Sequence, residues 1–170
     1  SNFNVNDFYD NSYTVFQLHN VGNKSVNFFT GSKYTNDDIV NALFSIEELF
    51  DYSEHPTSTM NVIDLKNKYD IYDIINARVT SGKTLFTNEE IIGANFPLVS
   101  YYDNSNIFTV KDLKDYANVD VSDIINETNY SPIDILDALY LPIDLYNSNF
   151  SIEHFHKSSN YNLNSYIDNS

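Results

Sequence analysis

The segment from 77 to 84 has the residues most suggestive of nucleotide chemistry. Ser81-Gly82-Lys83-Thr84 matches the end of a P-loop, in which backbone N–H groups and a lysine hold phosphate oxygens. The complete motif needs a glycine five positions before Gly82, where this chain has Ala77. It also needs a buried strand before the loop, whereas the residues here predict a helix. We therefore expect no nucleotide site and no cofactor.

The histidines are the next candidates, because imidazole is a common metal ligand. His154 and His156 are two residues apart, so a helix would point them in different directions, and the i,i+4 spacing of a zinc-binding helix is absent. His19 and His55 have no evident partner in the sequence. We expect a solvated helix face at 154–156 and no metal site.

The 24 Asp and Glu residues could serve calcium binding or a paired-carboxylate hydrolase. No Asp-x-Asp-x-Asp-Gly loop is present. Asp37-Asp38 and Glu47-Glu48 instead recur at one place in a repeating pattern, which indicates helix capping rather than catalysis. The chain has no Cys, which excludes thiolate catalysis and disulfides. With no nucleophile–base pair, we expect a non-enzymatic protein and keep an enzyme as the remote alternative.

The pattern is a unit of about ten residues, seen by comparing Tyr34-Thr35-Asn36-Asp37-Asp38-Ile39 with Tyr130-Ser131-Pro132-Ile133-Asp134-Ile135. Position one is aromatic, position two small and polar, position five acidic and position six apolar. The units start at Phe3, Tyr13, Tyr34, Phe44, Met60, Tyr69, Phe86, Phe96, Phe108, Val119, Tyr130, Tyr140, Phe150 and Tyr161. Position two departs from Ser, Thr, Asn or Asp only at Pro97 and Leu141. A degenerate unit occupies 23–33.

Each position of the unit has a role in a short helix. A Ser, Thr, Asn or Asp at position two is an N-cap, and an acid three residues later completes the spacing of a capping box. The aromatic residue before the cap can pack on the apolar residue at position six. A helix this short is unstable alone, so neighbouring units must bury it. The sequence predicts an all-α fold: one solenoid-like array over 1–170, regular from about 34, of two-turn helices stacked as αα-hairpins.

Tyr13-Thr14-Val15-Phe16-Gln17-Leu18-His19-Asn20-Val21-Gly22 and the residues from Phe108 to Ala117 show the unit most completely. They resemble the short tandem repeats of the form Tyr-Ser-x-x-Asp/Glu-Leu-Lys-x-Ala-Gly found in large proteins of giant viruses, protists and some bacteria. The resemblance covers nearly the whole chain and implies a structural role. Most units here lack the terminal Gly, so we expect Asn to end their helices.

Loop insertions break the period at 54–59, at 79–85 and at Asn106-Ile107. They follow alternate units, so in a stack of αα-hairpins they would project from one face, and such a face is often the binding face of a repeat protein. The competing interpretation is that the insertions have no function and that the repeat has simply decayed in surface loops. If the face binds a partner, the candidate contact residues are His55, Arg78, Lys83 and Asn104.

The formal charge of −15, with nine dispersed basic residues, argues against nucleic-acid binding. No apolar stretch approaches the about 18 residues of a membrane span. The apolar stretch 130–146 is either array core or a protein contact. Both terminal units keep the repeat register, which predicts a longer parent chain or end-to-end self-association.

These observations favour a structural or interaction scaffold that packs with copies of itself or with another protein. The alternative is an adaptor that binds a protein ligand through the 54–59 and 79–85 loops. The sequence identifies no compartment, and the resemblance favours an intracellular or virion-associated location.

Overall fold

The computed structural model describes residues 3–53, 60–78, 82, 84–151 and 153–154. In these residues the fold is all-α, as predicted, with an isolated antiparallel bridge between Arg78 and Thr84 and no strand. The chain divides into two compact units, Ser1–Thr87 and Asn88–Ser170. The prediction of one array over the whole chain stays a prediction.

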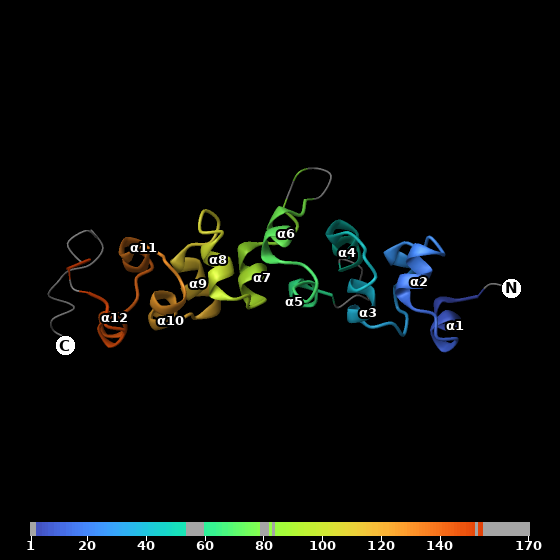
Figure 1. Cartoon of the computed structure of the whole chain (residues 1–170), viewed down its shortest axis with the longest axis horizontal. Helices are drawn as coiled ribbons and strands as arrows, with labels where there is room; N and C mark the ends of the chain where they lie inside the picture. The colour runs from blue at the N-terminus through green and yellow to red at the C-terminus, as the bar shows by residue number, and fades with distance from the viewer. Residues whose placement is uncertain (1–2, 54–59, 79–81, 83, 152, 155–170) are drawn as a thin grey trace. The chain divides into compact units, whose positions relative to one another are not determined.

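The helices of the first unit are α1 (Val5–Asp10), α2 (Val15–Asn20), the 3-10 helix η1 (Val26–Phe29), α3 (Asn36–Val40), α4 (Ile46–Ser53), α5 (Val62–Leu65) and α6 (Ile71–Asn76). Those of the second are α7 (Asn88–Gly93), α8 (Leu98–Tyr102), α9 (Val110–Ala117), α10 (Val121–Glu127), α11 (Pro132–Asp137) and α12 (Pro142–Asn147) (Figure 1). Each α-helix begins shortly after one of the twelve predicted unit starts from Phe3 to Tyr140, and η1 lies in the degenerate unit 23–33.

Capping boxes begin many of these helices. At α9, Thr109 Oγ1 accepts from the Asp112 N–H at 3.1 Å, and Asp112 Oδ2 accepts from the Thr109 N–H at 2.9 Å. The same reciprocal pair of bonds joins Asn4 and Asp7, Thr14 and Gln17, Thr35 and Asp38, Ser45 and Glu48, Asn61 and Asp64, and Ser131 and Asp134. Aspartate is thus long enough to complete the box, which satisfies backbone N–H groups that the first helical turn leaves without acceptors.

Several of the helices are followed by a residue in the left-handed conformation. Asn23, Asn95, Asn118 and Asn149 have positive φ, as expected from the missing glycines, and asparagine tolerates this conformation better than most residues. Leu43 and Leu139 also have positive φ, although an apolar side chain gains nothing there. A left-handed conformation costs an ordinary L-residue about 1–2 kcal/mol, so these two leucines are strained.

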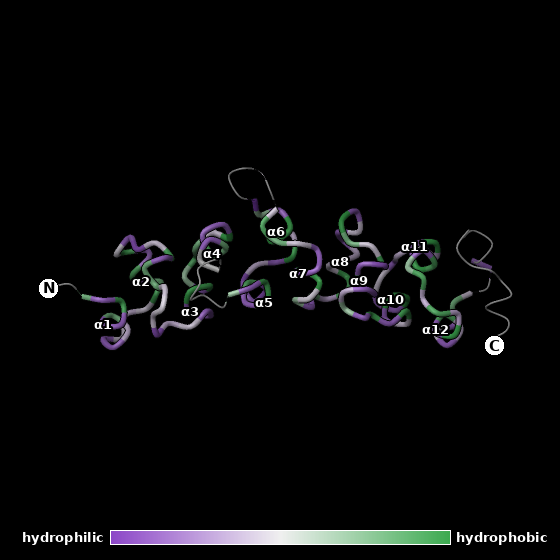
Figure 2. The backbone as a smooth tube through the Cα atoms, turned by 180° about the vertical axis from the view of Figure 1, so that it is seen from behind, coloured by the Kyte–Doolittle hydropathy of each residue, from purple (hydrophilic) through white to green (hydrophobic). Residues whose placement is uncertain are grey.

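Alternate helices pack against one another within each unit. In the second unit α7 contacts α9, α9 contacts α11, α8 contacts α10, and α10 contacts α12. Figure 1 shows α11 along one side of this unit and α10 and α12 along the other. Figure 2 shows hydrophobic and hydrophilic stretches alternating along the backbone, as a unit with apolar first and sixth positions requires.

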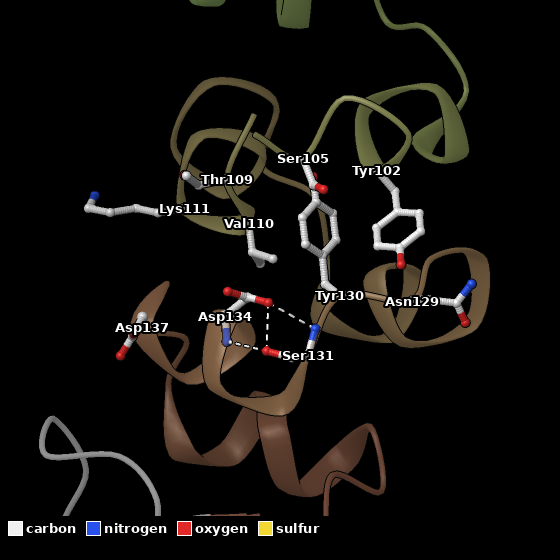
Figure 3. Close-up of a pocket in the computed structure, with 10 residues that line it drawn as sticks. All are labelled: Tyr102, Ser105, Thr109, Val110, Lys111, Asn129, Tyr130, Ser131, Asp134 and Asp137. Atoms are coloured by element: carbon white, nitrogen blue, oxygen red, sulfur yellow. Dashed lines mark hydrogen bonds between the residues drawn. The ribbon is translucent and has the colours of Figure 1, made fainter. Parts of the chain in front are cut away.

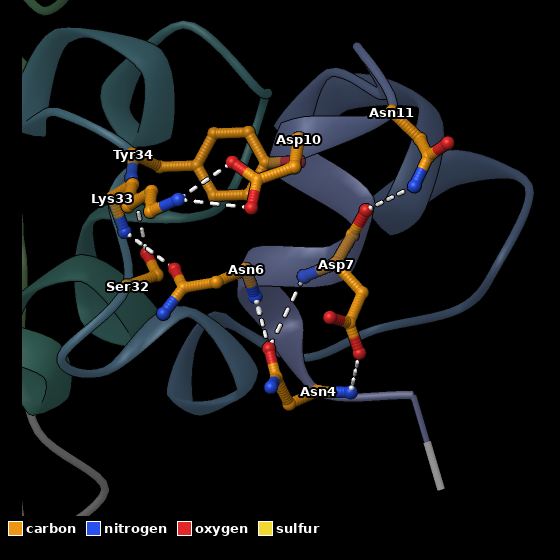
Figure 4. Close-up of polar contacts among 8 residues, drawn as sticks. All are labelled: Asn4, Asn6, Asp7, Asp10, Asn11, Ser32, Lys33 and Tyr34. Carbon is orange, nitrogen blue, oxygen red and sulfur yellow. Dashed lines mark hydrogen bonds and ion pairs between the residues drawn. The ribbon is translucent and has the colours of Figure 1, made fainter. Parts of the chain in front are cut away.

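Part of the core of the first unit is an aromatic cluster around Phe29. Phe29 is completely buried, with ring centroids 5.6 Å from Tyr34 and 6.1 Å from Phe44 in edge-to-face contacts. Lys33 ties α1 to this core: its N–H donates to Asn6 Oδ1 at 2.9 Å and its ammonium pairs with Asp10 at 2.6 Å (Figure 4). The degenerate unit therefore contributes packing although it lacks a regular helix.

Candidate functional site

A recess in the second unit has a volume of about 590 Å³ and lies between the start of α9 and α11 (Figure 3). Its aromatic wall is Tyr102 and Tyr130, whose ring centroids are 5.2 Å apart in an edge-to-face contact. Its polar wall includes Ser131 and Asp134, and Lys111 and Asp137 also line it. Both helix starts carry capping boxes, so three of the groups that line the recess, Thr109, Ser131 and Asp134, stabilise helix ends.

Ser131 and Asp134 form the arrangement closest to catalytic chemistry in this recess. Ser131 Oγ donates to Asp134 Oδ2 at 2.6 Å, and the same carboxylate oxygen accepts from the Ser131 N–H at 2.9 Å. A carboxylate alone is a weak base toward an alcohol, and no histidine lines this recess to activate the serine. The Thr109–Asp112 box repeats the geometry, with 2.7 Å between its hydroxyl and carboxylate oxygens. Recurrence of the pair at the starts of α9 and α11 indicates capping rather than catalysis.

Lys111 brings no available positive charge to the recess. Its ammonium pairs with Asp115 one helical turn later, and this contact raises the pKa of Lys111 and lowers that of Asp115. Within the described residues, no group of three or more His, Asp or Glu side chains could hold a metal ion. The recess therefore offers hydrogen-bonding groups and two tyrosine rings but no assembled catalytic or metal-binding set.

The two histidines in the described residues pack on aromatic rings. His19 is half-buried, its ring centroid is 4.0 Å from that of Phe44, and its Nδ1 lies 3.1 Å from the Lys24 carbonyl oxygen. His154 is also half-buried and lies 5.4 Å from the Phe150 ring, so this residue is less solvated than expected. His156 lies outside the described residues.

The structure describes two of the four predicted partner-binding residues. The Arg78 guanidinium donates to the carbonyl oxygens of Ile75 and Ala77, so it caps the C-terminal end of α6. Asn104 is half-buried and donates through Nδ2 to the Ser100 carbonyl at 2.9 Å. His55 and Lys83, and with them 54–59 and most of 79–85, lie outside the described residues. A shared binding face of the insertions therefore stays a prediction.

The sequence reasoning missed a set of long-range hydrogen bonds made by tyrosines at position one. Tyr130 Oη donates to the Phe108 carbonyl at 2.8 Å, and Tyr140 Oη donates to the Val119 carbonyl at 2.7 Å. In the first unit Tyr34 donates to the Tyr13 carbonyl and Tyr69 to the Phe44 carbonyl. Each acceptor is itself a first-position residue, 21 to 25 residues earlier. The presence of Tyr rather than Phe at these four first positions, each about two units after another first position, is the signal that could have predicted these bonds.

These tyrosines predict a loss of stability in alkali. Burial, followed by nearby carboxylates such as Asp134 and Asp120, raises the pKa of Tyr130 and Tyr140 above the ordinary 10.0. Because the folded pKa exceeds the unfolded one, their contribution to stability is fully present below about pH 10 and is lost as the pH rises above it. We expect the free energy of unfolding, measured with urea, to fall steeply in this range as tyrosinate absorbance appears.

The Tyr130→Phe/Tyr140→Phe double variant is the control for the alkaline loss. It removes two of the shifted hydroxyl groups, so its unfolding free energy should depend less on pH above 10 than that of the parent. Normal titration of every tyrosine in the folded protein would contradict the burial of these hydroxyls.

Comparisons with protein-family models, curated proteins and solved structures give no match to the chain. The resemblance to short tandem repeats therefore stays a prediction based on the residues quoted above. In the part of the chain that the structure describes, no helix has both the length and the apolar character to cross a bilayer.

Proposed function

We propose that the chain is a non-enzymatic interaction scaffold, a solenoid-like stack of short helices that packs with a protein partner or with copies of itself. The main support for this proposal is that polar side chains at repeat positions two and five cap the helices. Those that would be candidates for catalysis, such as Ser131 with Asp134 and Thr109 with Asp112, are engaged in helix capping. The packing of alternate helices within each unit supports the solenoid-like arrangement.

Exposed apolar side chains support an interaction role. Val21 is 87% exposed, Tyr72 64% and Leu141 63%, and several other large apolar residues are about half exposed. Scattered exposure of this kind is common. Leu141 is unusual because it stands at position two of its unit, where the repeat normally has a polar residue. A protein surface that covers such residues would gain the free energy of their burial.

Mass measurement by sedimentation at several protein concentrations tests the proposal, both for the purified chain and for the chain mixed with extract of its native cells. We expect either a mass that rises with concentration or a stable complex with a partner protein. A strictly monomeric chain that forms no complex would contradict a scaffold role. If the monomer turned over a small-molecule substrate, the scaffold role would have to be replaced by an enzymatic role.

A further inference from the structure

Leu139 holds an unfavourable conformation at an exposed position. Its φ is 58°, and its side chain is 50% exposed between the buried Ala138 and Tyr140. Asn95 has φ 57° at the equivalent position, between Ala94 and Phe96. At 95 the chain has a polar residue that tolerates this conformation, whereas Leu139 holds it at a cost in stability.

Leu141 departs from the repeat in a second way. It occupies the N-cap position of α12, is 63% exposed, and makes no side-chain capping bond. The following residues, Pro142-Ile143-Asp144, are identical in type to Pro132-Ile133-Asp134, which follow Ser131 in a complete capping box. We therefore expect the Leu141→Ser change to stabilise α12.

The two leucines point away from the core on either side of one buried residue. Tyr140 lies between them in sequence, is only 6% exposed, and donates its hydroxyl to the Val119 carbonyl. Lys114 holds the turn from the other side, because its ammonium donates to the Ala138 and Leu139 carbonyls at 2.9 and 2.8 Å. The segment is thus fixed in a shape that presents two apolar side chains at a stability cost, a combination typical of functional sites.

The charge around the leucines is negative. From Asn88 to His154 the chain has twelve Asp and Glu residues and two Lys, and both lysines are engaged, Lys111 with Asp115 and Lys114 with carbonyl groups. Asp120, Asp115, Asp123 and Asp144 lie close enough to Tyr140 for their charges to add to burial in raising its pKa. A second copy would bring the same excess of negative charge to a symmetric contact, which is unfavourable.

We propose that Leu139 and Leu141 form a docking site for an amphipathic, basic segment of a partner protein. The apolar residues of that segment would cover the two leucines, and its lysines or arginines would face the surrounding aspartates. This proposal rests on the interaction role proposed above and adds the chemistry of the partner. It explains why the chain has leucine at two positions where a polar residue would give a more stable fold.

The test uses the full-length protein and a fluorescent amphipathic helical peptide made of leucine and lysine. We expect binding that weakens with added salt, as charge complementarity requires. The Leu139→Asn/Leu141→Ser variant should raise the Kd by about tenfold or more, which corresponds to about 1.4 kcal/mol. Its free energy of unfolding should equal or exceed that of the parent, because both changes remove an unfavourable feature.

Leu43→Asn is the matched control. Leu43 is strained in the same way, with φ 67°, and is 55% exposed, but it belongs to the first compact unit. This variant should also be stabilised and should leave the Kd for the peptide unchanged. An equal effect of Leu43→Asn on binding would show that the site is not at 139–141.

Several results would overturn the docking site. These are an unchanged Kd for the double variant, equally tight binding of a serine–lysine peptide, and equally tight binding of a leucine–glutamate peptide. A loss of stability in the double variant would assign the leucines to the core. Self-association of the parent that the double variant abolishes would make a second copy the occupant. If the parent binds no peptide yet assembles in the sedimentation experiment, this proposal fails and the scaffold role stands.

Discussion

Replacing Phe108 by alanine is expected to lower the free energy of unfolding by about 3–5 kcal/mol, the usual cost of removing a buried phenylalanine. Phe108 is completely buried, and its ring centroid lies 5.3 Å from that of Tyr101 in an edge-to-face contact. Its carbonyl also accepts the Tyr130 hydroxyl, so collapse of the site would disturb the contact between α9 and α11. Urea unfolding followed by circular dichroism measures the loss.

Tyr116→Ala is the control for Phe108→Ala. Tyr116 belongs to the same compact unit but is 46% exposed and stands outside the repeat's first position. Its replacement should cost less than about 1 kcal/mol. Equal losses for the two variants would mean that position one is not the core of the unit.

Replacing Tyr101 by phenylalanine is expected to lower the free energy of unfolding by about 1–3 kcal/mol, although only one oxygen atom is removed. Tyr101 is 2% exposed, and its hydroxyl accepts from the Phe96 N–H at 2.9 Å. The hydroxyl also lies 3.2 Å from the carbonyls of Ile91 and Ile92, to which it can donate. Phenylalanine would leave the buried Phe96 N–H without this acceptor, and a buried unpaired donor is costly.

The measurement for Tyr101→Phe is the same urea unfolding, with Tyr116→Phe as the exposed counterpart. The loss of stability should appear only in the Tyr101→Phe variant. The Phe96 amide should exchange its hydrogen faster in that variant, because its acceptor is gone. A stable Tyr101→Phe variant with an unchanged Phe96 amide would show that the hydroxyl does not hold this turn.

The helices could be predicted because their signals are local. A cap such as Thr109 and its partner Asp112 are three residues apart, so sequence spacing alone indicates where α9 begins. Asparagine as a helix terminator was predictable for the same reason, and Asn118 has the left-handed conformation expected of it. The all-α fold follows from these local rules.

The long-range contacts could not be predicted in this way. The bond from Tyr140 to the Val119 carbonyl joins residues 21 positions apart, and Tyr and Phe are equally acceptable as staples at the local level. The strain at Leu139 was hidden too, because a leucine after alanine looks like ordinary core until its exposure and φ are known. The apolar stretch 130–146 was left open between core and contact, and in the structure it contains both buried Leu136 and exposed Leu141.

The proposed scaffold role depends most on one feature of the repeat: first-position aromatic residues tie alternate helices together. Nuclear Overhauser contacts in the full-length protein test it directly. We expect contacts from the Tyr130 ring to Phe108 and from the Tyr140 ring to Val119. The tyrosine hydroxyls lie 2.8 and 2.7 Å from the carbonyl oxygens of these residues, so the rings must be close to them. Contacts of these rings with their sequence neighbours alone would contradict it.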